Sequence, residues 1–324
     1  MTHPLTTILK SARARVLSLM LVAGVVSLAS SVLAQALKPG EWRTYTSMRT
    51  VVDVALAPDS AMAWAVTNGG AFRVDLRSGT AAPLAIRTTD GLAENDLTSV
   101  AVDRDENVYF GSGGGGFDIY HPLTGKIERH GADIQRSSYT LKSINGITVS
   151  GDTVFLATAY GLSLWNAKRS YFILNVGPLG PYAPDSVAQV LVWRGSIYAA
   201  MGSGIAIARV GTDLQNDKRW RLTPDTDGAV RTIAALGTTI LAGDSAGLKQ
   251  LSPDGTALTA VPLPSTEKVV RLVTMRDSLY ILCASGRLYA TTDLRTFTVS
   301  DANAIAGSAA TTVVVSPEHG PVIG

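Results

Sequence analysis

One pattern recurs six times along this chain, and that repetition limits the possible folds more than any other feature. The copies begin near residues 51, 98, 144, 188, 231 and 270, and each contains two apolar stretches separated by a turn. A glycine follows the second stretch at the same point of every copy: Gly70, Gly116, Gly161, Gly204, Gly247 and Gly286. These glycines are 39–46 residues apart. A period of about 40–45 residues is typical of four-stranded propeller blades.

The copy at residues 144–176 shows the strand pattern most clearly. Polar and apolar residues alternate there with the period of a strand, which predicts four strands over 144–150, 154–158, 162–165 and 171–176. Gly161 stands at a tight turn that favours positive φ. Segments with a helical period are nearly absent after residue 40. The sequence therefore predicts an all-β fold, a β-propeller over residues 40–324, in which each blade is buried against its neighbours.

The two ends of the repeat region bear on how the ring closes. Residues 42–48 (WRTYTSM) precede the first copy, and we expect them to form an outer strand donated to the last blade. Residues 311–316 (TTVVVS) open a seventh copy shortly before the sequence stops at Gly324. We therefore predict seven blades, six complete and one partial, in a sequence that is cut short or is the first domain of a longer protein.

The glycine-rich stretch after the second copy's apolar run raises the question of a nucleotide site. Gly111, Gly113 and Gly116 fit the spacing G-x-G-x-x-G. That fingerprint requires a helix to begin at its last glycine, so that free N–H groups face the phosphates. Residues 117–120 (FDIY) alternate as a strand instead. The glycines are better explained as a blade turn, and no cofactor is expected.

The first 34 residues have the layout of a signal peptide. A basic start with Lys10, Arg13 and Arg15 precedes an uncharged run that ends in small residues near Ala34 and Ala36. An uncleaved membrane anchor is the alternative, because nineteen uncharged residues nearly span a bilayer. We expect export to the periplasm, outer membrane or cell surface, with no integral span after cleavage.

Charge and cysteine content exclude several other classes. Without residues 1–34 the chain has 25 basic and 26 acidic residues, so no basic stripe is left to bind nucleic acid. The single cysteine, Cys283, lies in an apolar run and can form no disulfide within the chain. An exported chain without disulfides depends on its apolar core for stability.

Few residues suggest catalysis or metal binding. There are four histidines, and none has the i, i+4 spacing of a helical zinc site. The acidic run at 103–106 lacks the glycine and glutamate of a calcium loop, so it predicts a hairpin turn. Residues 252–255 and 291–293 resemble Asp-box turns, but both lack that motif's full spacing to an aromatic residue. We therefore expect a non-enzymatic protein with no catalytic and no metal-binding residues.

Binding residues are expected where the loops gather. In a propeller the blade-to-blade connections share one rim with the turns between second and third strands. Aromatic and charged side chains on these segments could anchor a partner; they are Asp90, Arg136, Tyr139, Tyr160, Tyr182, Asp185 and Asp225. The alternative is that they are ordinary solvated loop residues.

One repeat carries a family resemblance. Asp90-Gly91-Leu92, followed by residues 102–126 (VDRDENVYFGSGGGGFDIYHPLTGK), resembles the two-component regulator propeller repeat. Tyr109, Ser112 and Phe117 stand where that repeat usually has Trp, Thr and Leu. This resemblance implies the sensory, periplasmic propeller of a signalling protein cut off before its membrane span.

The layout of residues 40–320 resembles the N-terminal propeller of PorZ-like proteins of the type IX secretion system. The resemblance is carried by the stretch at 42–47 (WRTYTS), the copies at 144–170 and 190–210, and Trp220. It implies an exported binding protein whose partners are outer-membrane or cell-surface proteins, or a surface glycan such as lipopolysaccharide. The family's second propeller and C-terminal β-domain lie outside this sequence. A propeller lyase or glycosidase is a third reading, which would need a His or carboxylate cluster on one rim.

Overall fold

The computed structural model describes residues 46–324 except 60, 79, 181–184 and 302–308, and it confirms an all-β propeller. The described residues form six four-stranded antiparallel sheets, here called blades 1 to 6, with strands in sequence order. Blade 1 contains β1 (Val51–Leu56), β2 (Met62–Thr67), β3 (Gly70–Asp75) and β4 (Thr80–Ile86). Blade 2 contains β5 (Leu97–Val102), β6 (Val108–Ser112), β7 (Phe117–His121) and β8 (Lys126–Arg129). Blade 3 contains β9 (Ile144–Ser150), β10 (Thr153–Thr158), β11 (Gly161–Asn166) and β12 (Tyr171–Val176).

The remaining blades repeat this order. Blade 4 contains β13 (Val187–Trp193), β14 (Ser196–Met201), β15 (Gly204–Arg209) and β16 (Arg221–Pro224). Blade 5 contains β17 (Thr232–Leu236), β18 (Thr239–Gly243), β19 (Leu248–Leu251) and β20 (Leu258–Val261). Blade 6 contains β21 (Val269–Met275), β22 (Ser278–Cys283), β23 (Arg287–Thr291) and β24 (Thr298–Asp301). The described residues also form three short helices. Two lie in blade-to-blade connections, η1 (Thr88–Asp90) and α2 (Ala132–Gln135), and η2 (Asp217–Arg219) lies between β15 and β16 within blade 4.

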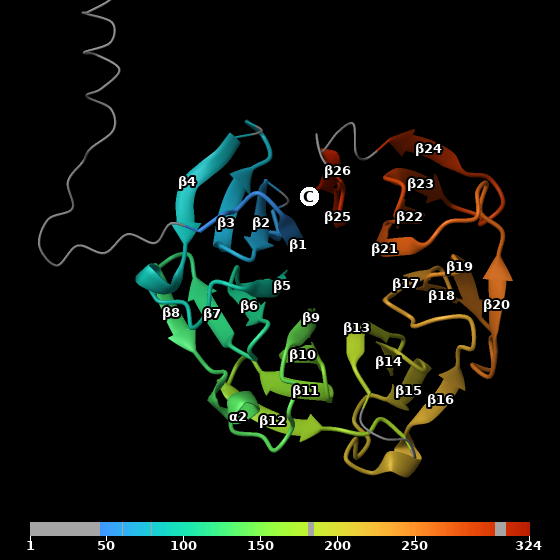
Figure 1. Cartoon of the computed structure of the whole chain (residues 1–324), viewed down its shortest axis with the longest axis horizontal. Helices are drawn as coiled ribbons and strands as arrows, with labels where there is room; N and C mark the ends of the chain where they lie inside the picture. The colour runs from blue at the N-terminus through green and yellow to red at the C-terminus, as the bar shows by residue number, and fades with distance from the viewer. Residues whose placement is uncertain (1–45, 60, 79, 181–184, 302–308) are drawn as a thin grey trace, which may run out of the picture. The chain divides into compact units, whose positions relative to one another are not determined.

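The innermost strands of successive blades contact one another around a ring (Figure 1). Side-chain oxygens of one inner strand accept hydrogen bonds from backbone N–H groups of a neighbouring inner strand. Asp53 Oδ2 accepts from the N–H of Val100 at 3.2 Å, and Gln189 Oε1 accepts from the N–H of Ile233 at 3.0 Å. Such bonds satisfy backbone groups that a strand edge would otherwise leave unpaired.

A two-stranded sheet closes the ring. It consists of β25 (Val313–Ser316) and β26 (Gly320–Ile323), and β25 contacts both β21 and β1. The hydroxyl of Thr311 donates to the carbonyl oxygen of Val51, at the start of β1. Arg271 of β21 and Asp53 of β1 also form an ion pair at 2.9 Å. The start of a seventh copy is thus confirmed as strand, while the described residues complete six blades rather than seven.

The expected donated strand over residues 42–48 is not seen in the part that is described. Residues 42–45 lie outside the described residues, and Thr46–Met48 form no strand. The hydroxyl of Thr46 donates to the carbonyl oxygen of Gly69 at 2.6 Å, so this stretch lies against the β2–β3 turn of blade 1. Thr46 therefore contacts blade 1, which is not the last blade expected from the sequence.

The recurring glycines occupy equivalent turns between second and third strands, with one shift. Gly161 has φ +140°, and a Cβ there would collide with the carbonyl oxygens of Val176 and Gly177. In blade 2 the turn is one residue longer, and positive φ falls on Gly115 (+86°) rather than on Gly116. Gly116 leads directly into the strand β7, as predicted from the alternating residues after it.

The core lies between the blades. Trp64 of blade 1 packs edge-on against Tyr120 of blade 2 at 5.3 Å, and Phe117 of blade 2 packs against Trp165 of blade 3 at 5.6 Å. Burying an aromatic or large aliphatic side chain stabilises a fold by roughly 1.5–3 kcal/mol. Across the described ranges, no helix is long and apolar enough to cross a membrane.

Candidate functional site

The antiparallel blades place their loops on two opposite rims. The turns between second and third strands lie on the same rim as the blade-to-blade connections, here called the connection rim. The turns between first and second and between third and fourth strands lie on the other, here called the hairpin rim. The binding residues predicted from the sequence that the structure describes belong to the connection rim.

Carboxylates on the connection rim bind the turn of the following blade. Asp185 Oδ2 accepts from the N–H of Ser203 at 2.9 Å, and Glu94 Oε2 accepts from the N–H of Gly114 at 3.0 Å. Glu267 accepts hydrogen bonds from side chains rather than from backbone N–H groups, and it forms an ion pair with Arg287 at 2.5 Å. Burial opposes ionisation of Glu267, but hydrogen bonds from its neighbours lower its pKa to about 2. These carboxylates therefore hold each connection against the blade that follows it.

The predicted residue Asp225 belongs to a buried ion cluster. Lys249 Nζ lies 2.5 Å from Asp225 Oδ1, 2.8 Å from Asp244 Oδ2 and 2.9 Å from Asp227 Oδ2. The side chains of Lys249, Asp225 and Asp244 are 6%, 2% and 1% exposed. Burial raises the pKa of Asp225, whereas Lys249 and neighbouring N–H groups hold that of Asp244 below its ordinary value against burial. Asp225 is therefore not available to a partner.

Tyr139 and Tyr160 form a stacked pair. Their ring centroids are 4.2 Å apart with planes 6° from parallel. Tyr160 was expected in an exposed turn, but it is 3% exposed and its hydroxyl lies 2.6 Å from Ser163 Oγ. It is buried because the connection that carries Tyr139 folds over the β10–β11 turn. The pair belongs to the core between connection and blade.

The other predicted residues divide into three cases. Asp90 is exposed at η1, where its Oδ2 accepts from the N–H of Arg87 at 2.9 Å, so it stabilises its own turn. Arg136 is exposed after α2. Tyr182 lies outside the described residues. Of the six predicted residues that are described, the structure brings Tyr139 and Tyr160 together and does not gather all six into one site.

A buried acid that sequence reasoning did not identify also lies near this rim. Asp118 is 2% exposed; its Oδ2 accepts from the N–H of Ala93 at 2.8 Å, and its Oδ1 has no hydrogen-bond partner. Burial raises the pKa of Asp118 to about 6, although the Ala93 N–H and Arg129 favour the charged form. The carboxyl anchors the connection that follows Asp90-Gly91-Leu92.

Several clefts of the described residues open on the hairpin rim. The largest of these, about 680 Å³, lies over the hairpin turns of blades 1 to 3. Both carboxylate oxygens of Asp103 in this cleft are already hydrogen-bonded within the turn, because they accept bonds from Asn107, Tyr109 and the N–H of Asp105. That bonding also confirms residues 103–106 as a hairpin turn. This cleft has no aromatic residue in its lining.

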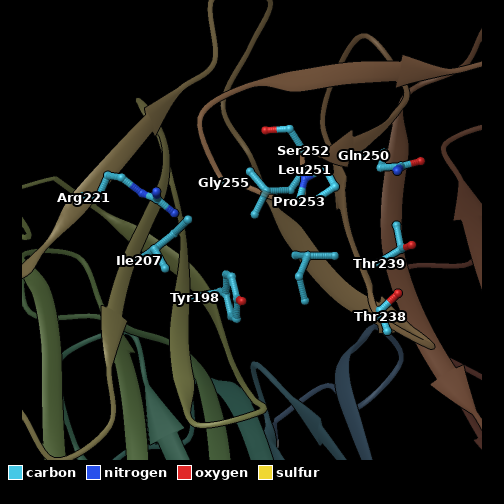
Figure 2. A pocket seen from close by; sticks show the side chains of 11 residues that line it. Tyr198, Ile207, Arg221, Thr238, Thr239, Gln250, Leu251, Ser252, Pro253 and Gly255 are labelled. Atoms are coloured by element: carbon cyan, nitrogen blue, oxygen red, sulfur yellow. The ribbon is translucent and has the colours of Figure 1, made fainter.

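A second cleft, of about 300 Å³, lies between blades 4 and 5 and is here called the blade 4–5 cleft. Figure 2 shows Tyr198, Ile207 and Arg221 on the blade 4 side of the cleft. On the blade 5 side, the tips of Thr239 and Gln250 point away from Tyr198. The Ser252–Gly255 turn, with Leu251 and Pro253, covers one side. Clefts of roughly 300–1,000 Å³ that combine apolar walls with a few polar groups are typical of small-ligand sites.

The polar groups of the blade 4–5 cleft are not occupied by the fold. Within the described part of the chain, the side chains of Tyr198, Thr238, Thr239 and Gln250 make no hydrogen bond. Arg221 Nη1 donates to the carbonyl oxygen of Asp254 at 2.6 Å, which leaves its other N–H groups unused. The connection rim uses its polar side chains for stability, whereas this cleft presents them to solvent.

Local sequence explains how these residues are placed. Tyr198 follows the pattern of β14 (SIYAAM), in which it faces blade 5 beside Ile207. Gly255 has φ +69°, and a Cβ there would collide with the guanidinium of Arg221. Sequence reasoning missed the cleft because its residues are scattered over 198–255 in five segments. The available signal was the Ser252–Gly255 turn, which the sequence marked only as a turn.

Other residues of chemical interest prove structural. Cys283 is fully buried in β22, and burial raises the pKa of its thiol to about 12. His121 and His130 both lie near Glu128, with Nε2–carboxylate distances of 3.8 and 3.2 Å. Among the residues that the structure describes, no group of three His, Cys, Asp or Glu side chains is placed to hold a metal.

Comparison with solved structures confirms the resemblance at the level of the fold. PorZ, an essential bacterial surface component of the type IX secretion system of Porphyromonas gingivalis, matches with TM-score 0.70 and 17% identity. The match covers 87% of this chain and 36% of PorZ, so the chain spans about a third of that protein. No protein-family profile and no curated protein matches the sequence significantly.

Two further structures have the same architecture. The extracellular domain of a putative hybrid two-component system from B. thetaiotaomicron matches with TM-score 0.67 and 16% identity, over 86% of this chain and 39% of that one. The WD40 repeats of RRP9 match with TM-score 0.62 and 9% identity, over 79% and 81% of the two chains. At such identities the likeness establishes a β-propeller and does not identify a ligand.

Proposed function

We propose that this chain is an exported, non-enzymatic propeller that binds a cell-surface glycan through the blade 4–5 cleft. The observation that carries the proposal is Tyr198 in one cleft with Arg221, whose guanidinium has unused N–H groups. Sugar rings have an apolar face and many hydroxyls, which suit an aromatic ring beside Thr and Arg side chains. A cleft of about 300 Å³ also suits a few sugar rings better than a protein surface.

Its proposed location is the periplasm, outer membrane or cell surface. The signal-like pattern of residues 1–34 supports export, as does the fold shared with a bacterial surface component and with an extracellular domain. On this proposal the chain acts as PorZ-like proteins do, in secretion or cell-surface attachment. The alternative is a sensory propeller, favoured by the similar match to the two-component extracellular domain. A propeller lyase or glycosidase is the third hypothesis.

We further propose that β25 and β26 are the first two strands of a seventh blade. The support is their position between blades 6 and 1, where β25 takes the place of an inner strand. A ring with this sheet has no gap between β21 and β1.

The binding proposal is tested by calorimetric titration with delipidated surface oligosaccharides, including those of lipopolysaccharide. The matched variants are Tyr198→Ala and Tyr280→Ala, because Tyr280 occupies the same position of β22 as Tyr198 does of β14. We expect saturable binding that Tyr198→Ala weakens at least tenfold, as loss of an aromatic anchor costs about 1–3 kcal/mol. Tyr280→Ala should bind as wild type. Absence of saturable binding, or equal loss in both folded variants, would refute the proposal.

A further inference from the structure

The charge distribution of the blade 4–5 cleft points to a particular class of ligand. Among the residues that line it, Arg221 is the one charged side chain. The nearest turn contains a carboxylate, Asp254, but it accepts hydrogen bonds from Ser252 Oγ and Thr256 Oγ1 at 2.6 and 2.7 Å. Those bonds hold the pKa of Asp254 at about 2, so it stays ionised and bound to its own turn. The cleft therefore offers a ligand one cation and no lining anion.

The guanidinium of Arg221 is held at one end of the cleft. Its Nη1 donates to the backbone carbonyl oxygen of Asp254. Thr223, two residues along β16, donates from Oγ1 to the carbonyl oxygen of Gly255 at 2.5 Å. Both bonds join β16 of blade 4 to the same turn of blade 5. Figure 2 shows the side chain of Arg221 extending toward Gly255 and Ile207. A guanidinium fixed in this way loses less conformational entropy when it binds a ligand.

Planar paired donors suit a carboxylate. A guanidinium presents parallel N–H groups that bind both oxygens of a carboxylate, and such charge-assisted bonds are about twice as strong as neutral ones. Opposite Arg221, the hydroxyl of Thr238 at the edge of the cleft suits a sugar hydroxyl. Tyr198 and Ile207 supply the apolar wall between the two ends.

We infer that the blade 4–5 cleft binds an acidic saccharide, with the carboxylate of a uronic-acid residue on Arg221 and the sugar ring against Tyr198. This inference rests on the proposed function, since it names the ligand class of the same cleft. It also assigns separate roles: Arg221 selects for the acid, and Tyr198 contributes to the binding of any saccharide.

The test uses calorimetric titration with a galacturonate trisaccharide and with its methyl ester, which has the same ring but no charge. Wild type should bind the acid at least tenfold more tightly than the ester. Arg221→Gln should bind both equally, near the ester's affinity, and Arg221→Lys should keep part of the preference. The matched control is Arg295→Gln, which removes the same charge from the exposed β23–β24 turn of blade 6. Thermal unfolding checks that each variant is folded.

The outcomes separate the inference from the proposed function. Equal wild-type affinities for acid and ester, or an acid preference that persists in Arg221→Gln, would overturn the inference. If neutral surface oligosaccharides bind in a Tyr198-dependent way while the acid does not, the inference fails and the proposed function stands. If no saccharide binds at all, both fail.

Discussion

Replacing Lys249 with Met tests whether the connection rim is built for stability. The substitution leaves the carboxylates of Asp225 and Asp244, whose side chains are 2% and 1% exposed, without their shared cation. Breaking a buried ion pair by removing one partner costs about 3–5 kcal/mol. For a domain of this size that is roughly 5–9 °C in Tm. The loss should appear in urea unfolding followed by tryptophan fluorescence at pH 7.5.

The loss of stability in Lys249→Met should depend on pH. Without Lys249 the pKa values of both buried carboxyls rise, so protonation at pH 5 relieves part of the repulsion and the penalty should shrink. Adding Asp225→Asn and Asp244→Asn to the variant should restore most of the stability at pH 7.5. The control is Lys126→Met, whose lysine is 66% exposed and pairs with Glu128 at the surface, where a pair contributes about 0–1 kcal/mol. A loss for Lys249→Met no larger than this control would refute the reasoning.

Three further predictions concern the turns, the buried acid and the N-terminus. Asp118 has a pKa of about 6 in the fold and an ordinary value of 3.8. The free energy of unfolding should therefore fall by about 3 kcal/mol as pH rises from 4 to above 6, because the folded state binds the proton more tightly. Urea unfolding of Asp118→Asn should lack this decrease. Gly161→Ala should cost about 3 kcal/mol or more in unfolding free energy, because its Cβ meets two carbonyl oxygens, whereas Gly151→Ala, with open space around its Cβ, should cost about 1 kcal/mol; equal losses would contradict this. Mass spectrometry of the exported protein should find a mature N-terminus after Ala34 or Ala36, and an intact Met1 would contradict cleavage.

The sequence was sufficient to predict the blades because their determinants are local. Strand alternation and turn glycines act over a few residues, and the four strands predicted within 144–176 differ from the observed ones by at most one residue at any end. The shift from Gly116 to Gly115 arose because one extra residue in the turn moves the positive φ, which spacing alone does not show.

The roles of loop residues could not be predicted in the same way. Tyr160 and Asp225 appear in the sequence as turn and connection residues, and only their contacts with Tyr139 and Lys249 show that they stabilise the fold. Tyr198 lies in the strand β14, and it was not singled out from the sequence. Its place in a cleft depends on the distance between blades 4 and 5, which no local pattern encodes.

Hydrogen–deuterium exchange with and without a saturating surface oligosaccharide most directly tests which rim binds. We expect slower exchange in three segments around the blade 4–5 cleft: residues 196–207, 238–240 and 250–255. Exchange in the connections at 130–143 and 177–186 should not change. Protection confined to those connections, with the cleft segments unchanged, would contradict the central claim and place binding on the connection rim.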